Sequence, residues 1–187
     1  MGNSMGGLLV TLWVIIRHPQ IGGLILSGPL LALADGFFPR LRHLAKITSA
    51  LAPGLRVTRI PLEWLARDRM VIDRFRNDPL VHHGCFTVRV AAEILRAMRH
   101  VSAEAAALDL PLLILQGSQD RICGPGGSRA FYEKAGSTDK TYHLYEGFYH
   151  EVFDEPQRDC VLADLTTWLD QRSPAAGVAT CPHGAET

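Results

Sequence analysis

The feature that most constrains this chain is a glycine-rich turn at its start, followed at once by an apolar run. Gly2 and Gly6 each stand two residues from Ser4, and residues 8–16 are almost entirely apolar. Glycines at these places allow a sharp strand-to-helix turn, which lifts the serine hydroxyl clear of both elements and points the helix N-terminus at it. Ser4 is therefore a candidate nucleophile, and the free backbone N–H of Met5 is a candidate oxyanion donor.

A short motif of this kind is weak evidence alone, because a Gly/Ser-rich N-terminus is more often just a flexible start. Two later stretches strengthen the catalytic interpretation. Leu112–Leu115 has the pattern of a buried strand, and the polar loop after it carries Asp120. Thr141–Tyr145 is a second strand pattern, and the loop after it carries His150. Serine, aspartate and histidine in this order, the last two just past strands, is the chain order of the α/β-hydrolase triad.

The acid and the histidine also have structural interpretations. Aspartate is a favoured turn residue, so on spacing alone Asp120 fits a turn as well as a triad. Histidines are mostly structural, but of the eight in this chain His150 alone directly follows a predicted strand. In a triad, Asp120 would accept the imidazole N–H of His150 and stabilise the imidazolium that forms.

Four segments resemble the monoacylglycerol lipases and related serine hydrolases of the α/β-hydrolase fold: GNSMGG, NDPL, LQGSQDRIC and DKTYHLYEGFYHE. The resemblance extends from Gly2 to about Arg172, and it implies hydrolysis of a fatty-acyl glycerol ester. Two departures stand out. Asn3 occupies a place where the family usually has histidine. The family also has five strands before the turn, with a loop that supplies the second oxyanion donor, whereas this sequence starts at the turn and leaves nothing to position Ser4 from behind.

The resemblance also places Leu30, Ile122 and Cys123 at the substrate. In the family a cysteine follows the acid as Cys123 follows Asp120, and it makes those enzymes sensitive to thiol reagents. The alternative is a buried, unreactive thiol, because free cysteine is among the most buried residue types.

The predicted fold class is α/β: the C-terminal part of an α/β-hydrolase, with parallel strands, flanking helices and a helical cap. Residues 1–29 would form the turn, a helix and the strand Leu24–Ser27, and residues 30–110 the cap, without strands and with its clearest helix at Thr87–Leu108. A cap there would lie over the carboxyl ends of the strands, where open α/β sheets bind ligands, or its helices would merely cover the sheet. Residues 111–172 would complete the core, and residues 173–187 would be a disordered tail.

Charge is unevenly distributed, although the formal net charge is zero and gives no field that favours nucleic acid. Residues 36–100 hold twelve basic against five acidic side chains, and residues from 101 onward hold six against thirteen. A basic cap with apolar residues between its charges fits peripheral contact with an anionic membrane surface. The alternative is that these charges form the solvated face of the helices.

The cysteines and the apolar run indicate the compartment. Cys85, Cys123, Cys160 and Cys181 have neither metal-site spacing nor a dense framework, which fits a reducing, cytoplasmic location without disulfides. The apolar run is too short for a membrane span, so we expect a buried helix that ends near His18, before a proline.

We therefore predict a serine ester hydrolase that requires no cofactor or metal and acts on a small lipid ester. A peptidase, lysophospholipase or general esterase would use the same residues. The alternatives of another class are a truncated or mis-started chain that is catalytically inactive, and a binding remnant that keeps only the apolar pocket. The hypothesis of an inactive chain rests on the missing strands and on the missing second oxyanion donor. Loss of that donor alone would lower the rate about a hundredfold or more.

Overall fold

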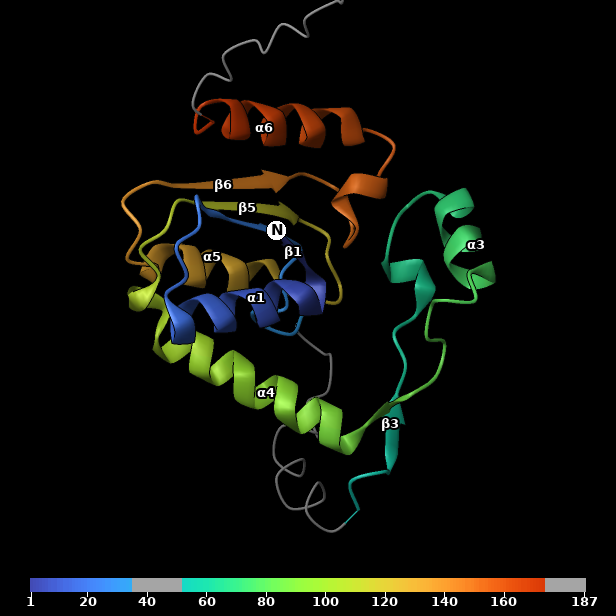
Figure 1. Cartoon of the computed structure of the whole chain (residues 1–187). Helices are drawn as coiled ribbons and strands as arrows, with labels where there is room; N and C mark the ends of the chain where they lie inside the picture. Colours follow the sequence, from blue (N-terminus) through green and yellow to red (C-terminus); the bar gives the residue numbers. More distant parts are fainter. Residues whose placement is uncertain (35–51, 174–187) are drawn as a thin grey trace, which may run out of the picture.

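A parallel sheet of four strands forms the centre of the structure, a computed structural model that describes residues 1–34 and 52–173. The strand order is β1-β2-β5-β6, and every neighbouring pair is parallel (Figure 1). The four strands are β1 (Gly2–Asn3), β2 (Leu24–Ser27), β5 (Leu112–Gly117) and β6 (Lys140–Tyr145). Parallel strands bring their carboxyl ends to one edge of the sheet, so the junction of β1 with α1 and the loops after β5 and β6 meet there.

Helices cover both faces of this sheet. In β5, Leu112 and Ile114 belong to one apolar cluster, whereas Leu113 and Leu115 belong to another. The first cluster packs against α1 (Ser4–Arg17), α4 (Val88–Ala103) and α5 (Pro125–Lys134), and the second packs against α6 (Arg158–Asp170). Figure 1 shows α6 on one side of the sheet and α1 and α5 on the other. A strand buried on both faces explains the continuous apolar run of β5.

The first helix ends as its sequence predicts. α1 extends to Arg17, and His18 adopts the left-handed conformation, with its N–H donating to the carbonyl of Val14. A left-handed residue followed by Pro19 is a common way for a helix to stop.

The segment between β2 and β5 differs from its prediction in two ways. It contains two short strands, β3 (Arg56–Thr58) and β4 (Phe86–Thr87), which pair antiparallel. The expectation of a segment without strands was therefore wrong, because strands of two or three residues leave no alternating pattern to recognise. The predicted helix Thr87–Leu108 is also divided. α4 starts after Thr87, whose hydroxyl accepts the N–H of Val90, and a short 3-10 helix, η2 (Ala105–Ala107), follows it.

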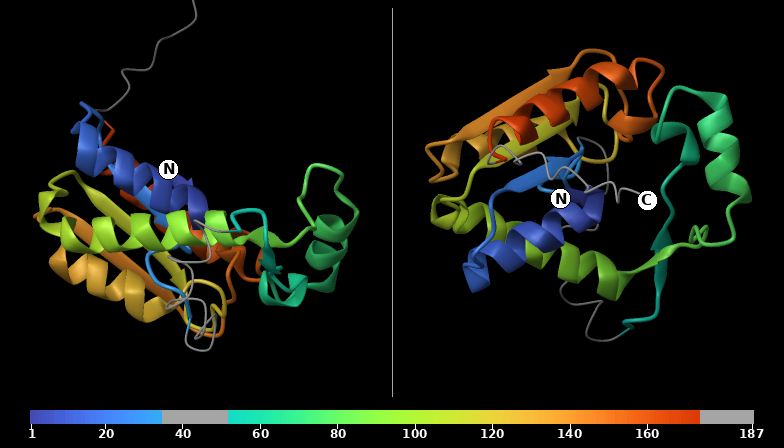
Figure 2. Two further views of the ribbon diagram at one scale, coloured as in Figure 1. Left: turned by 90° about the horizontal axis from the view of Figure 1, so that it is seen from below. Right: turned by 45° about the horizontal axis from the view of Figure 1, so that its top comes forward.

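The same segment also holds η1 (Leu62–Trp64) and α3 (Arg69–Asn77). Both lie beyond the end of the sheet toward which β5 and β6 point, and two further views show α3 standing apart from the sheet layers (Figures 1 and 2). The remainder of the predicted cap, residues 35–51, lies outside the described residues, as do Cys181 and the predicted tail from residue 174. Among the helices in the described ranges, none combines the length and hydrophobicity that crossing a membrane requires.

Candidate active site

Ser4 lies at the junction of β1 and α1, in a strained backbone conformation. Its φ is 51°, in the left-handed region that non-glycine residues rarely adopt and that carries a cost of about 1–3 kcal/mol. Two contacts hold this turn: β1 pairs with Leu26 and Ser27, and the N–H of Leu30 donates to the carbonyl of Ser4 at 3.0 Å. The expectation that nothing positions Ser4 from behind was wrong, because the two residues directly before it pair with β2.

The two motif glycines do not have equal roles. A side chain at Gly2 would place its Cβ 2.6 Å from Cγ1 of Val10 and 2.8 Å from the carbonyl oxygen of Gly6, so the start of α1 leaves no room for it. A Cβ at Gly6 would meet nothing within 4 Å. The close approach instead involves Gly7, where a Cβ would lie 3.0 Å from Cβ of Pro29. Close packing therefore explains why glycine is needed at positions 2 and 7, whereas position 6 has room for a side chain.

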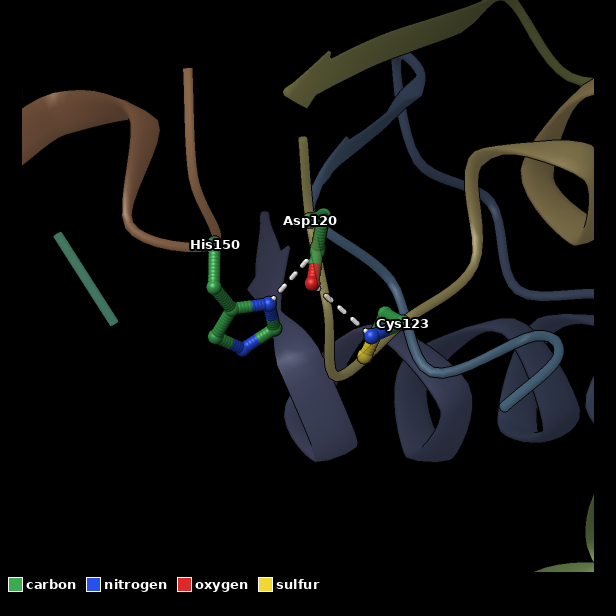
Figure 3. Close-up of side chains that lie close together, drawn as sticks. All are labelled: Asp120, Cys123 and His150. Atoms are coloured by element: carbon green, nitrogen blue, oxygen red, sulfur yellow. Dashed lines mark hydrogen bonds and ion pairs between the residues drawn. The ribbon is translucent and has the colours of Figure 1, made fainter. Parts of the chain in front are cut away.

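The structure brings the three predicted residues into one hydrogen-bonded row. Nε2 of His150 lies 2.8 Å from Oγ of Ser4. Nδ1 of the same ring lies 2.8 Å from Oδ2 of Asp120, and Figure 3 shows this second contact. The side chains of His150 and Asp120 are 2% and 0% exposed. With Nδ1–H donating to the carboxylate, Nε2 is left as the acceptor that faces the serine hydroxyl.

Asp120 is held by more than the histidine. Its Oδ1 accepts the backbone N–H groups of Ile122 and Cys123, both at 2.9 Å. Its Oδ2 accepts the side-chain amide of Gln116 at 3.0 Å, and the amide oxygen of Gln116 accepts the hydroxyl of Ser128 at 2.9 Å. The contacts of Asp120 fit both the turn interpretation and the triad interpretation, because one carboxylate oxygen closes the turn and the other faces the imidazole.

The charge environment favours a protonated His150. Burial lowers the pKa of this histidine, but its hydrogen bonds with Asp120 and Cys123 and the negative charge of Asp120 outweigh burial and raise the pKa well above 6.5. A carboxylate that accepts an imidazole N–H stabilises the imidazolium. The same interaction strengthens His150 as a proton acceptor once it is neutral.

Two glycines that the motif analysis passed over make room for the histidine loop. Gly28 has φ +45°, and a Cβ there would lie 2.9 Å from the carbonyl oxygen of His150 and 3.2 Å from its Nδ1. At Gly117, the last residue of β5, a Cβ would lie 2.1 Å from the carbonyl oxygen of Tyr149. Gln116 was also missed as the partner of Asp120. Glycines at strand ends and a polar residue inside an apolar strand are the signals that point to such close approaches.

Cys123 lies beside Asp120 and His150, but it is fully buried at 0% exposure. One ligand atom from each of Asp120, Cys123 and His150 lies within 4.8 Å of the others, a spacing that could hold a metal. The donor set fits a metal poorly, because Asp120 and Nδ1 of His150 already bond each other and burial raises the pKa of the Cys123 thiol. A neutral thiol is a weak ligand. The cluster is better explained as part of the hydrogen-bonded row.

An apolar cavity of about 180 Å³ opens at the serine. Ser4 and Met5 are among its lining residues. So are Leu30 and Ile122, two of the three residues predicted to lie at the substrate, whereas Cys123 does not line it. The other lining residues are apolar: Leu33, Ile60, Phe86, Ala91, Ile94 and Leu95. A larger groove of about 810 Å³ runs between α1 and α4, but it includes Met5 without Ser4. The smaller cavity is therefore the candidate for a group attached to the reacting carbonyl.

Comparison with known proteins agrees with this geometry. Residues 1–157 match the family described as "Serine aminopeptidase, S33". The chain is 36% identical over 169 residues to the monoacylglycerol lipase of Mycolicibacterium smegmatis, covering 90% of this chain and 60% of that protein. It is 32% identical over 185 residues to the human monoglyceride lipase, covering 97% of this chain and 61% of that one.

The solved structures give the same result. A crystal structure of Paleococcus ferrophilus monoacylglycerol lipase superposes with a TM-score of 0.85 at 30% identity, covering 92% of this chain and 67% of the other. The chain thus spans about 60% of the length of the curated relatives above. It belongs to the serine aminopeptidase S33 family and has the α/β-hydrolase fold of the monoacylglycerol lipases.

Proposed function

We propose that this chain carries the triad of a serine ester hydrolase that cleaves monoacylglycerols. The observation that carries the proposal is the row Ser4–His150–Asp120, with 2.8 Å at each step, at the end of an apolar cavity. This geometry is that of a hydroxyl activated by an adjacent general base whose orientation a buried acid fixes.

The roles follow from the contacts. Nε2 of His150 takes the proton of the Ser4 hydroxyl as Oγ attacks the ester carbonyl, and the backbone N–H of Met5 stabilises the oxyanion from the start of α1. The imidazolium then gives its proton to the leaving alcohol, which leaves an acyl group on Ser4. A water molecule, deprotonated by the same nitrogen, releases the acid. Asp120 keeps its negative charge throughout and orients the ring.

The cavity supports a fatty-acyl group as the acid part of the ester. Apart from Ser4, its lining residues have apolar side chains, which suits a hydrocarbon chain and leaves the reacting carbonyl at Ser4. An aminopeptidase needs a carboxylate near the scissile bond to hold the substrate ammonium, and no acidic side chain is among the described residues that line this cavity. Relatives named monoacylglycerol lipase and monoglyceride lipase favour the same substrate class.

The segment around η1, α3 and α4 is proposed as the cap over this cavity, since Ile60 and Phe86 line the cavity together with residues of α4. Membrane contact through its basic side chains also remains a prediction. Four of its arginines form ion pairs, which reduces the charge available to a membrane. These pairs are Arg67 with Glu155, Arg74 with Asp154, Arg76 with Asp73 and Arg89 with Glu93.

The proposal is tested by substrate preference. The protein is incubated with 1-oleoylglycerol or with leucine p-nitroanilide, and the released fatty acid or nitroaniline is measured. Hydrolysis of the ester alone, abolished in His150→Gln and kept in His143→Gln, is the expected result; His143 is a half-exposed histidine in β6. Cleavage of the anilide alone would favour a peptidase. Cleavage of neither by folded protein would favour the inactive alternative.

A further inference from the structure

The loop that carries His150 is held on both sides of the histidine. The backbone N–H of Tyr149 donates to Oε1 of Glu155 at 2.7 Å, and the N–H of Glu151 donates to the carbonyl of Leu65 at 2.8 Å. The loop itself has little regular structure, since η3 (Val152–Asp154) spans only three residues. The position of the imidazole therefore depends on the two acceptors of these hydrogen bonds, the carboxylate of Glu155 and the carbonyl of Leu65.

Glu155 is itself held by an arginine from the segment between η1 and α3. Nε of Arg67 lies 2.6 Å from Oε2 of Glu155, and its Nη2 donates to the side chain of Gln157 at 2.6 Å. The guanidinium also lies 5.1 Å from the centre of the Phe148 ring. The carboxylate of Glu155 is fully buried, whereas the side chain of Arg67 is 34% exposed. A buried carboxylate that loses its cationic partner becomes strongly unfavourable, so Arg67 keeps Glu155 in place.

We propose that Arg67 and Glu155 are positioning residues that fix His150 against Ser4 and Asp120. The inference rests on the proposed function, in which His150 is the general base. Glu155 binds the amide before His150, and the backbone at Leu65, two residues from Arg67, binds the amide after it. Figures 1 and 2 show η1 beside η3, so a segment far away in sequence holds the base from outside the sheet.

This arrangement joins the proposed cap to the base. Leu65 and Arg67 follow η1, and Ile60 and Phe86 in the same segment line the acyl cavity. A shift of the segment around η1 would therefore move the carbonyl of Leu65 directly and the carboxylate of Glu155 through Arg67. These two groups are the acceptors that hold the histidine loop. Displacement of a base by about 1 Å can lower a rate a hundredfold, so the rate depends on the segment's position.

The chain offers a matched control. Arg74 of α3 also pairs with the same loop, at 2.8 Å from Asp154, but this pair is more exposed, with the side chains 67% and 26% accessible. Loss of the Arg74 pair shows how far the removal of any ion pair between α3 and the histidine loop changes His150. The Arg67 pair differs from it in that Glu155 also binds an amide next to His150.

The experiment measures His150 directly. The imidazole of His150 is titrated by NMR in the wild type, Arg67→Gln, Arg67→Lys, Glu155→Gln and Arg74→Gln, with its signal assigned from His150→Gln. The titratable groups around the ring are Asp120, Cys123 and Glu151, and the variants change none of them. We expect the raised pKa of His150 to fall toward its ordinary value in Arg67→Gln and Glu155→Gln, to fall less in Arg67→Lys, and to stay unchanged in Arg74→Gln.

Ester hydrolysis gives the second readout. In Arg67→Gln we expect kcat to fall about tenfold or more, with KM within about twofold, and in Arg74→Gln both values should stay near those of the wild type. An unchanged titration of His150 in folded Arg67→Gln would overturn the inference, as would equal effects of the two arginine variants. If Glu155→Gln does not fold, the two Arg67 variants decide. The titration needs no turnover, so it separates failure of this inference from failure of the proposed activity.

Discussion

Asn3, the residue before the nucleophile, donates its side-chain amide to Glu151, the residue after the histidine. Nδ2 of Asn3 lies 3.0 and 3.2 Å from the two carboxylate oxygens of Glu151. Burial raises the pKa of Glu151, and the hydrogen bond from Asn3 acts in the opposite direction. Asparagine thus supplies the donor at the place where the family usually has histidine, and it links the nucleophile turn to the histidine loop.

We expect Asn3→Ala to destabilise the protein by about 1 kcal/mol at pH 8, because the carboxylate of Glu151 loses its hydrogen bond. A carboxyl group with a raised pKa penalises the charged folded state, so this penalty appears as the pH rises above about 4.5. The loss in Asn3→Ala should therefore be smaller at pH 4 than at pH 8. Urea unfolding at both pH values measures it, and Asn3→His, which keeps a donor, is the control. Equal losses at both pH values would contradict the role of Glu151.

The rate should depend on the protonation of His150. Because hydrogen bonding to Asp120 raises the pKa of His150 well above 6.5, and because only the neutral ring accepts a proton, kcat/KM should increase with pH through neutrality. Asp120→Asn should move this increase to lower pH and reduce the plateau on the order of 10⁴-fold. The stability of the folded protein should change with pH in the opposite direction to the rate. The ion pair of His150 with Asp120 stabilises the folded state fully below about pH 6.5, and this stabilisation is lost as the pH rises through the pKa of His150 in the folded protein. A rate that falls from pH 6 to pH 8 would contradict this account.

The glycines of the serine turn should respond differently to alanine. Gly2→Ala should abolish activity and lower the melting temperature, since its Cβ would lie within 2.8 Å of the backbone of α1. Gly6→Ala should keep activity within about threefold and the melting temperature at or above that of the wild type, because alanine is the better helix former. Thermal unfolding and ester hydrolysis of both variants test this. A strong loss in Gly6→Ala would show that the motif requires its second glycine for a reason other than space.

Cys123 should react slowly with thiol reagents. It is buried and burial raises its pKa, so at pH 7.5 iodoacetamide should modify the exposed Cys160 at least tenfold faster. Peptide mass spectrometry over a time course measures both sites. Cys123→Ala should remain active, because the thiol lies outside the row from Ser4 to Asp120. Rapid modification of Cys123, with loss of activity, would instead favour the reactive thiol that the family resemblance implies.

The sequence predicted the three members of the row from local signals, which are the glycines around Ser4 and the strand patterns before Asp120 and His150. β2 and β5 are apolar runs bounded by turn residues, so Asp120 could be placed after a strand before any contact was known. Contacts between distant segments were not predicted. Gly28 contacts His150 and Arg67 contacts Glu155 across about 90 to 120 residues of chain, and neither contact leaves a periodic pattern. The strand β1 was also missed, because its two residues become a strand only through pairing with β2.

The most direct test of the central claim is the identity of the nucleophile. The protein is treated with a fluorophosphonate probe, digested and mapped by mass spectrometry, with Ser4→Ala and Ser27→Ala as the variant and its control; Ser27 is a buried serine at the end of β2. We predict a single phosphonylated residue, Ser4, with labelling lost in Ser4→Ala and kept in Ser27→Ala. Unchanged labelling in Ser4→Ala, or a label on any other residue, would contradict the assignment of Ser4, His150 and Asp120 as a catalytic triad.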